Sequence, residues 1–147
     1  MRYFIFLLLM LAPAHTAAQS GANAADWKNR GLQVRVTNIR VIDGDTFDAV
    51  LALADGQGFH VRVRLADIDT PELRGKCDRE KRLARAAKAF AADWLSVPPV
   101  KLAVRGRGRY GRLLAAVESG RGDLSGALMG AGLARVYVPG RGSWCAS

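Results

Sequence analysis

Three segments of alternating apolar and polar residues, at 33–41, 46–53 and 59–67, constrain the fold more than any other feature of this chain. Successive side chains of a β-strand point to opposite faces, so this alternation is typical of strands with one buried face. Two short turns rich in aspartate and glycine, at 43–45 and 55–58, separate the segments, and these residue types favour tight turns. The sequence therefore predicts a three-stranded meander.

The same alternation assigns the faces of the second and third segments. The side chains expected to face the core are Phe47, Ala49, Leu51, Leu53, Val61, Val63 and Leu65. The opposite face of the third segment carries His60, Arg62 and Arg64. We expect His60 to lie on this polar strand face and give it no catalytic role.

A helix is predicted over 79–96, with Asp78 as its N-cap. The apolar residues spaced for one helical face are Leu83, Ala87, Phe90 and Trp94. The basic side chains expected to be solvated are Arg82, Arg85 and Lys88. Because proline cannot continue a helix, Pro98-Pro99 is expected to stop it.

The remaining sequence predicts two more strands and a short helix. We expect strands at 100–104 and 112–117, separated by a basic, glycine-rich loop. Asp123 is expected to cap a helix that Gly132 ends, and 133–138 to be extended. Strands, a helix and then strands favour a five-stranded β-barrel of the OB type packed with two helices, an α+β fold.

The first residues have the layout of a secretory signal peptide. Arg2 precedes the apolar run 4–11, Pro13 breaks this run, and the small residues 16–18 suit a peptidase. The run is too short to span a bilayer as a helix, and the alternative interpretation is an N-terminal core helix. We predict cleavage after Ala18.

This cleavage defines three expected regions: a signal peptide at 1–18, a flexible lead-in at 19–32 and one domain at 33–147. No cysteine lies at the predicted cut, and no second apolar segment is long enough to cross a membrane. We therefore expect a protein exported to the periplasm or medium, without a membrane anchor. No obligate protein partner is indicated, and we predict a monomer.

The positive charge of the chain indicates which classes of binding partner it favours. The formal net charge is +9, and loss of the leader, whose one charged side chain at pH 7 is Arg2, leaves +8. An exported domain this basic favours a polyanion as its partner: nucleic acid, anionic lipid or acidic polysaccharide. The alternative is that the charge merely keeps the protein soluble, and charge alone does not decide between them.

Two cysteines, Cys77 and Cys145, both lie after the leader. In an oxidising compartment an isolated pair favours a disulfide over two free thiols. The pair lacks the partner cysteines and nearby histidines of a zinc site. We therefore predict a disulfide that ties the end of the chain to its middle.

Carboxylates gather at two expected strand ends. Asp43 and Asp45 share one turn, and Asp67, Asp69 and Glu72 cluster where the third strand is expected to end. Hard oxygen ligands from two such segments suit Ca²⁺. An Asp-Gly-Asp triplet alone is more often an ordinary turn, and Asp43 and Asp67 could equally cap turns.

Two arginines are placed where they could compensate this negative charge. Arg64 lies in the strand that leads to Asp69, and Arg112 follows the basic, glycine-rich loop. A guanidinium donates two parallel hydrogen bonds and suits phosphate oxygens better than an ammonium does. Arginines, a divalent cation and a carboxylate are sufficient for phosphodiester hydrolysis, although a surface salt bridge is the ordinary role of any single arginine.

Three motifs in order resemble the thermonuclease (staphylococcal nuclease-like) family, over about residues 34–138. They are Val41-Ile42-Asp43-Gly44-Asp45-Thr46, then Arg62-Val63-Arg64-Leu65-Ala66-Asp67-Ile68-Asp69-Thr70-Pro71-Glu72, and then Arg109-Tyr110-Gly111-Arg112. The resemblance implies an OB-type barrel and Ca²⁺-dependent hydrolysis of DNA and RNA, which would be the substrates. The family's long C-terminal helix is not expected in this chain.

The resemblance also implies roles for single residues. Asp45 and Asp69 would be the calcium carboxylates, with the Thr70 backbone carbonyl as a third ligand, and Arg109 and Tyr110 would contact a nucleotide phosphate. The implied catalytic residues are Arg64 and Arg112, which would bind the phosphate and stabilise the transition state, and Glu72, which would act on the attacking water. We expect the arginines and the metal to lower the pKa of Glu72, so that it orients water more than it removes a proton.

The expected function is therefore an exported phosphodiesterase that cuts DNA and RNA as an endonuclease. The rival is a non-catalytic OB module that binds single strands, but carboxylates beside a phosphate site would repel its ligand. A third interpretation, a basic protein that coats an anionic surface, explains the positive charge but not the spacing of the carboxylates and arginines. With only His15 and His60 in the chain, a Ser-His-Asp hydrolase is disfavoured. Tyr137 is equally compatible with base contact and with packing.

Overall fold

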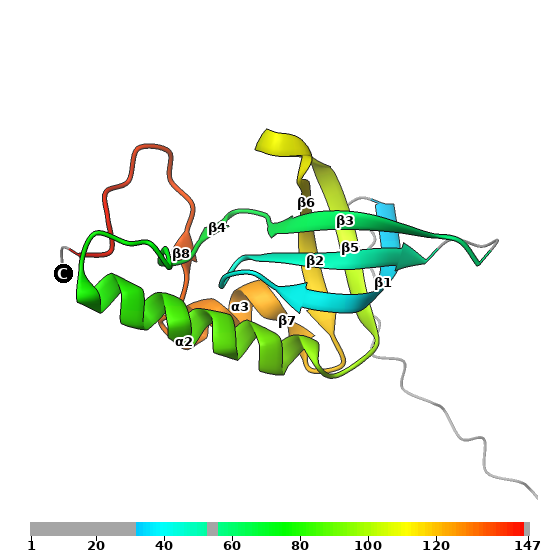
Figure 1. Cartoon of the computed structure of the whole chain (residues 1–147), viewed down its shortest axis with the longest axis horizontal. Coiled ribbons are helices and arrows are strands. Elements are labelled where there is room, and N and C mark those ends of the chain that lie inside the picture. The colour runs from blue at the N-terminus through cyan, green and yellow to red at the C-terminus, as the bar shows by residue number, and fades with distance from the viewer. Residues whose placement is uncertain (1–31, 53–55, 146–147) are drawn as a thin grey trace, which may run out of the picture.

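The computed structural model describes residues 32–52 and 56–145 (Figure 1). The predicted signal peptide and all of the lead-in before Leu32 lie outside the described residues, as does Leu53. The barrel strands are β1 (Leu32–Val41), β2 (Thr46–Ala52), β3 (Gly58–Leu65), β5 (Val100–Arg107) and β6 (Leu113–Ser119). The shorter elements are β4 (Ile68–Asp69), α2 (Asp78–Leu95), the 3₁₀ turn η1 (Arg109–Gly111), β7 (Gly122–Asp123), α3 (Leu124–Gly130) and β8 (Arg135–Val136).

The barrel closes through one parallel pairing. The strands follow the order β3-β2-β1-β5-β6 with antiparallel neighbours, and β3 then pairs with β6 in parallel. This last pairing sets Arg64 opposite Leu114, two residues after Arg112. The predicted five-stranded barrel with two helices is confirmed, and its closure brings two distant arginine-bearing segments together.

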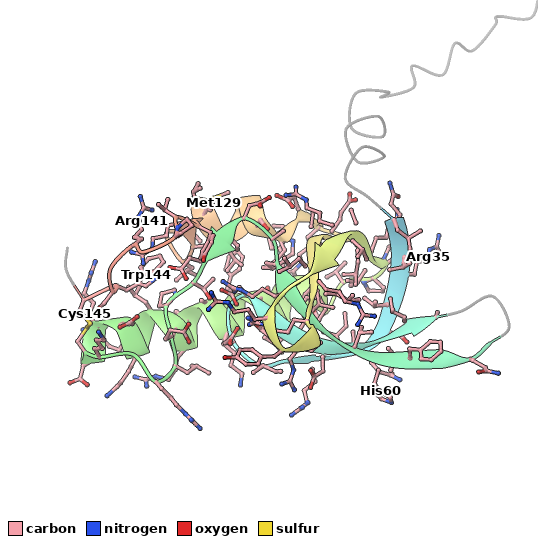
Figure 2. All side chains as sticks on the ribbon, turned by 90° about the horizontal axis from the view of Figure 1, so that it is seen from above. Arg35, His60, Met129, Arg141, Trp144 and Cys145 are labelled. Carbon is pink, nitrogen blue, oxygen red and sulfur yellow. A yellow bond between two sulfur atoms is a disulfide. The ribbon has the colours of Figure 1, made fainter. Side chains whose placement is uncertain are left out.

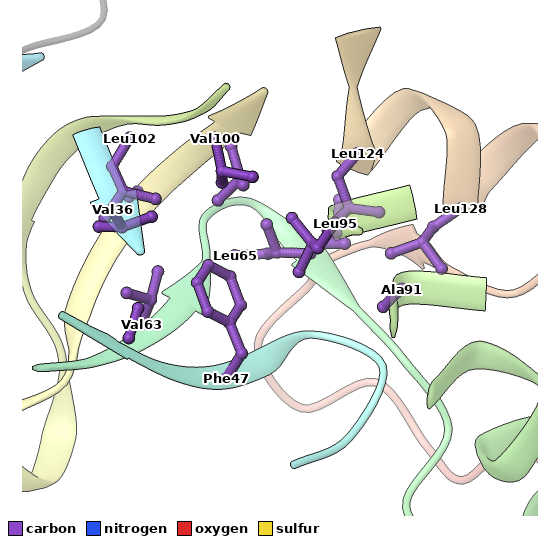
Figure 3. Packing of buried hydrophobic residues seen from close by; sticks show 14 of the residues in the cluster. Val36, Phe47, Val63, Leu65, Ala91, Leu95, Val100, Leu102, Leu124 and Leu128 are labelled. Carbon is purple, nitrogen blue, oxygen red and sulfur yellow. The ribbon is translucent and has the colours of Figure 1, made fainter. Parts of the chain in front are cut away.

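The core lies between the barrel and the helices (Figure 3). Its largest fully buried side chains include Phe47, Leu65 and Leu102 from the barrel and Leu124 and Leu128 from α3. Figure 3 shows the ring of Phe47 beneath the cluster formed by strands and helices. The predicted inward faces of β2 and β3 are confirmed for the residues described, since all are buried or partly buried.

The predicted N-cap of α2 is wrong, and its predicted buried face is confirmed only in part, since Ala87 lies in the core while Phe90 and Trp94 pack against it. The N-cap is Cys77, whose Sγ accepts a hydrogen bond from the Glu80 N–H at 3.5 Å. The buried residues are Glu80, Ala84, Ala87, Ala91 and Leu95, while the larger Leu83, Phe90 and Trp94 are only partly buried. Small alanines let the helix approach the barrel closely: a Cβ added to Gly44 would lie 2.7 Å from the Ala87 Cβ.

The predicted ends of α3 are confirmed. The Asp123 side chain accepts a hydrogen bond from the Gly126 N–H at 2.8 Å. Gly132 adopts φ +69°, and the Leu133 N–H then reaches the Leu128 carbonyl at 2.9 Å. Because glycine adopts positive φ without strain, it ends the helix here.

The predicted loop at 105–111 is only partly a loop. Strand β5 continues to Arg107, which pairs with Leu113, because β6 offers a partner across the hairpin. The hairpin tip is the 3₁₀ turn η1, in which Tyr110 has φ 60°. The basic residues of this segment are therefore fixed on a strand and a tight turn.

The end of the described chain returns to the start of α2. Strand β8 pairs with β4, and Cys145 forms a disulfide with Cys77, their Cα atoms 5.9 Å apart. Figure 2 shows Cys145, Trp144 and Arg141 together at one end of the molecule, with His60 and Arg35 at the other. Among the described residues, no helix is long and apolar enough to cross a membrane.

Candidate functional site

Asp45 is the centre of a buried polar network that joins three strand ends. Its side chain is 6% exposed and forms an ion pair with Arg64 at the end of β3. Its other carboxylate oxygen, Oδ2, accepts hydrogen bonds from the Thr70 hydroxyl at 2.9 Å and from the Thr70 N–H at 3.2 Å. The start of β2 is thereby tied to β3 and to the segment that follows β4.

The turn before β2 sets the position of Asp45. The Ile42 and Asp43 N–H groups both donate to the Thr46 carbonyl, and the Asp43 side chain accepts from the Asp45 N–H at 3.2 Å. Gly44 is needed in this turn because there is no room for a side chain. An added Cβ would lie 2.7 Å from the Ala87 Cβ and 3.0 Å from Thr70 atoms. Asp43 thus orders the turn and does not pair with any described arginine.

The charges around this turn shift two pKa values upward. Burial raises the pKa of Asp43, and the neighbouring Asp45 carboxylate raises it further. Burial alone would lower the pKa of Arg64, but the Asp45 carboxylate outweighs this effect and the pKa is raised. Arg64 therefore remains a cation, although its side chain is only 17% exposed.

Arg64 also lines a groove with the arginines of the β5–β6 hairpin. This groove, here called the arginine groove, has a volume of about 480 Å³, and its lining includes Arg64, Ile68, Arg105, Arg109, Arg112 and Tyr137. Among the described residues, no carboxylate pairs with Arg109 or Arg112. The Arg112 Nε instead donates to the Arg109 carbonyl at 3.2 Å. Two cations therefore face the groove without an anionic partner, whereas Arg105 pairs with Asp67.

The two tyrosines of this region differ in position. Tyr110 is 95% exposed at the hairpin tip and does not line the arginine groove, although the Arg112 guanidinium lies 6.0 Å from its ring centre. Tyr137, 53% exposed, does line the groove. The aromatic side chain that borders the groove is therefore Tyr137, to which the sequence assigned no role.

A second groove lies on the other side of β4. It has a volume of about 380 Å³ and is here called the tail groove, because the final described residues line it together with Asp69, Thr70, Glu72, Glu80 and Arg135. The Arg135 Nε donates to Asp69 Oδ2 at 3.0 Å and its Nη2 forms an ion pair with the same oxygen at 3.0 Å, to which the Trp144 Nε1–H also donates at 3.2 Å. Sequence reasoning missed Arg135 and Trp144, and the one signal for Trp144 was its place beside Cys145.

The expected lowering of the Glu72 pKa does not hold in the protein alone. Partial desolvation in the tail groove raises this pKa, and the carboxylates of Asp45, Asp43 and Asp69 raise it further. Arg64 acts in the opposite direction and is outweighed. The expectation fails because Glu72 is partly buried and because nearby acidic side chains act on it, and sequence spacing indicates neither.

The residues at this site fit a hard divalent cation. Asp45 and Asp69 would supply carboxylate oxygens and Thr70 a backbone carbonyl, donor types that Ca²⁺ accepts together with water. The acidic side chains of this region also favour a cation among them, because Asp45 raises the pKa of the partly buried Asp43, and Asp45, Asp43 and Asp69 raise that of Glu72. Within the described chain, the one cluster of three closely spaced potential ligands is Cys77, Glu80 and Cys145, and the disulfide removes its thiolates.

The predicted residues therefore divide into two connected groups. Arg64, Arg109 and Arg112 line the arginine groove, while Asp69, Thr70 and Glu72 line the tail groove. Asp45 links the groups through Arg64 and Thr70. His60 is exposed on β3, at the opposite end of the molecule from Trp144 (Figure 2).

The family model of staphylococcal nuclease homologues matches residues 62–143, more than half of the 147 residues. The matched region runs from the second half of β3 past β8, and so contains both arginine-bearing segments and the acidic segment after β3. No curated protein matches the chain. With its closed five-stranded barrel, two helices and this match, the chain belongs to the family of staphylococcal nuclease homologues, which supports a nuclease-like, nucleic-acid-binding role.

Proposed function

We propose that this protein is an exported, calcium-dependent nuclease that hydrolyses phosphodiester bonds of DNA and RNA endonucleolytically. The observation that carries the proposal is the network around Asp45. It joins Arg64, in the arginine groove, to Thr70, in the tail groove, so that phosphate-binding cations and metal-binding oxygens meet at β4.

Arg64 and Arg112 are proposed to bind the phosphate that is cleaved. Both line one groove, and the half-buried Arg112 carries no carboxylate partner among the described residues that a phosphate would have to displace. Fixed guanidinium groups stabilise negative charge that develops on the phosphate oxygens as water attacks. Arg109 would hold a neighbouring phosphate, and Tyr110 or the groove-lining Tyr137 would support a sugar or base.

Glu72 is proposed to act on the attacking water from the tail groove. The pKa of Glu72 is raised in the protein alone, whereas a cation beside it would favour the ionised carboxylate, which suits orientation of water. Calcium held by Asp45, Asp69 and the Thr70 carbonyl would supply Lewis-acid charge stabilisation at the phosphate. We assign orientation of the water to Glu72 and most of the rate enhancement to electrostatic stabilisation by the two arginines.

Endonucleolytic cleavage is supported by the two grooves. Ile68 borders the arginine groove and its neighbour Asp69 borders the tail groove, so a strand whose phosphate lies at β4 has a groove on each side. The layout of residues 1–18 supports export, and so does the disulfide, which persists in oxidising compartments. Amino-terminal sequencing of the exported protein tests this part; an uncleaved leader would contradict it.

The proposal is tested by digestion of single-stranded DNA with the mature chain, in calcium and then in chelator, beside Glu72→Gln and Arg112→Ala. We expect cutting that requires calcium and that both substitutions suppress. A circular single strand distinguishes an endonuclease from an enzyme that needs an end. Salt-sensitive binding without cutting, across several divalent metals, would instead favour the non-catalytic OB module.

A further inference from the structure

The Asp69 carboxylate is held from one side only. Its Oδ2 accepts hydrogen bonds from the Arg135 Nε at 3.0 Å and the Trp144 Nε1 at 3.2 Å, and the Arg135 Nη2 lies 3.0 Å away. No described residue donates a hydrogen bond to Oδ1. One oxygen is thus fixed by the protein, while the other is left to accept a ligand from outside it.

Trp144 reaches Asp69 because the tail, residues 141–145, is anchored at several points. The Cys77–Cys145 disulfide ties it to the N-cap of α2, and the Arg79 Nη1 donates to the Trp144 carbonyl at 2.9 Å. Arg135 bonds the Gly142 carbonyl at 2.7 Å, and its guanidinium lies 4.4 Å from the Trp144 ring centre. The tail, Arg135 and Asp69 therefore form one connected unit.

We propose that this disulfide-anchored tail is part of the cation site: Trp144 and Arg135 position Asp69 so that Oδ1 presents to a divalent cation. The proposal rests on the proposed function in one respect, namely that Asp69 binds the cation. Groups that hydrogen-bond a ligating carboxylate fix its orientation, and their loss typically weakens metal binding by about 10- to 100-fold.

The two positioning residues act differently. Arg135 orients Asp69 but also brings a positive charge toward the cation, so its removal has opposing effects. Trp144 orients the carboxylate with a neutral N–H, so its removal has one expected direction. Trp144→Phe is therefore the cleaner variant, because it keeps an aromatic ring beside Arg135 while the N–H donor is lost.

The first arm of the test is calcium titration by calorimetry of wild type, Trp144→Phe and Trp94→Phe. The Trp94 Nε1 donates to the Gly122 carbonyl at 3.1 Å, so Trp94→Phe loses the same donor away from Asp69. We expect the calcium Kd to rise about tenfold in Trp144→Phe and to stay unchanged in Trp94→Phe. The melting temperature in chelator should not fall further in Trp144→Phe than in the control, and saturating calcium should restore kcat.

The second arm releases the tail without removing Trp144. Cys77→Ser/Cys145→Ser breaks the disulfide while serine still serves as an N-cap for α2. We expect a calcium Kd raised at least as much as in Trp144→Phe. Reduced wild-type protein, with two free thiols counted, should behave in the same way.

Asp69→Asn separates this inference from the proposed function. Suppose that wild type binds calcium and that Asp69→Asn weakens binding. If Trp144→Phe and the double serine variant then bind calcium as wild type does, the tail has no positioning role. The inference is then overturned and the proposed function is not. If Asp69→Asn binds calcium as tightly as wild type, or wild type binds none, the assigned metal site is wrong and the inference is overturned with it.

Discussion

The arginine groove and the tail groove hold their charged residues in opposite ways. In the arginine groove, Arg109 and Arg112 have no carboxylate partner among the described residues. In the tail groove, Asp69 is bonded to Arg135 and Trp144, and Glu80 accepts from the Lys76 N–H at 3.0 Å. An anionic substrate meets unpaired cations in one groove, whereas Asp69 and Glu80 in the other are held in place before any cation binds.

The two grooves also differ in the range of the interactions that build them. Arg109 and Arg112 are fixed by a tight turn within one hairpin. The bonds that hold Asp69 join it to residues 66 and 75 positions later in the chain. Preorganisation of the phosphate site is therefore local, and that of the cation site depends on the complete fold. Arg64 connects the two sites, since it lines the arginine groove and also pairs with Asp45.

Arg64→Ala should have the largest effect because it removes a phosphate-binding cation and the partner of a buried carboxylate. We expect kcat to fall by about 10²-fold or more, by analogy with loss of one transition-state donor. The free energy of unfolding should fall by about 1–3 kcal/mol, because Asp45 loses its cation. Denaturation in chelator and DNA digestion measure the two effects, and a fully stable Arg64→Ala would show that the pair with Asp45 is unimportant.

Arg112→Ala should reduce activity without a loss of stability. We expect a fall in kcat of about 10²-fold with an unchanged denaturation midpoint, since Arg112 has no carboxylate partner to leave unpaired. Arg35→Ala is the matched control: this exposed arginine lies on β1, outside both grooves. Equal losses of activity in the two variants would mean that total charge, and not the arginine groove, determines the rate.

Gly44→Ala tests whether the turn before β2 needs its close contacts. The added Cβ would lie 2.7 Å from the Ala87 Cβ and 3.0 Å from Thr70. We expect a loss of about 1–3 kcal/mol in the free energy of unfolding, the usual cost of overpacking. Gly130→Ala, with open space around its Cβ, serves as the control. Tolerance of Gly44→Ala would mean that α2 can move away from the turn.

Asp48→Asn should have the smallest effect, because Asp48 pairs with arginines on the barrel surface. Its hydrogen bond from Arg62, together with Arg40, lowers its pKa below the usual value. A lowered pKa in the folded state contributes stability above the unfolded-state pKa, and this contribution is lost as pH falls through the folded-state pKa. Wild type and Asp48→Asn should differ slightly at pH 7 and converge in acid; a constant difference would assign the effect to packing.

The sequence predicted those parts of the fold that depend on neighbouring residues. Alternation identified the strands that carry Phe47 and Val63, and Asp123 with Gly132 marked both ends of α3. It was less accurate for α2, where large side chains were taken to define the buried face. Size is a poor guide there, since Ala84, Ala87 and Ala91 allow a close approach that larger residues would prevent.

Family resemblance named the candidate site residues, yet it gave no account of their partners. The ion pair of Arg64 with Asp45 and the bonds of Thr70 to the same carboxylate follow from barrel closure. The upward shift of the Glu72 pKa follows from partial burial of its side chain and, to a lesser degree, from the acidic side chains near it. Such effects depend on distances in space, which spacing along the chain does not specify.

By itself the sequence determined the strands, the ends of α3, the basic charge and the motifs of the site, because each depends on residue types within a few positions of one another. Only the tertiary structure decided that two grooves flank β4, that Tyr137 borders the arginine groove, and that Arg135 and Trp144 hold Asp69. These contacts form only when the barrel has closed and the disulfide has returned the tail to α2, so they depend on the whole chain.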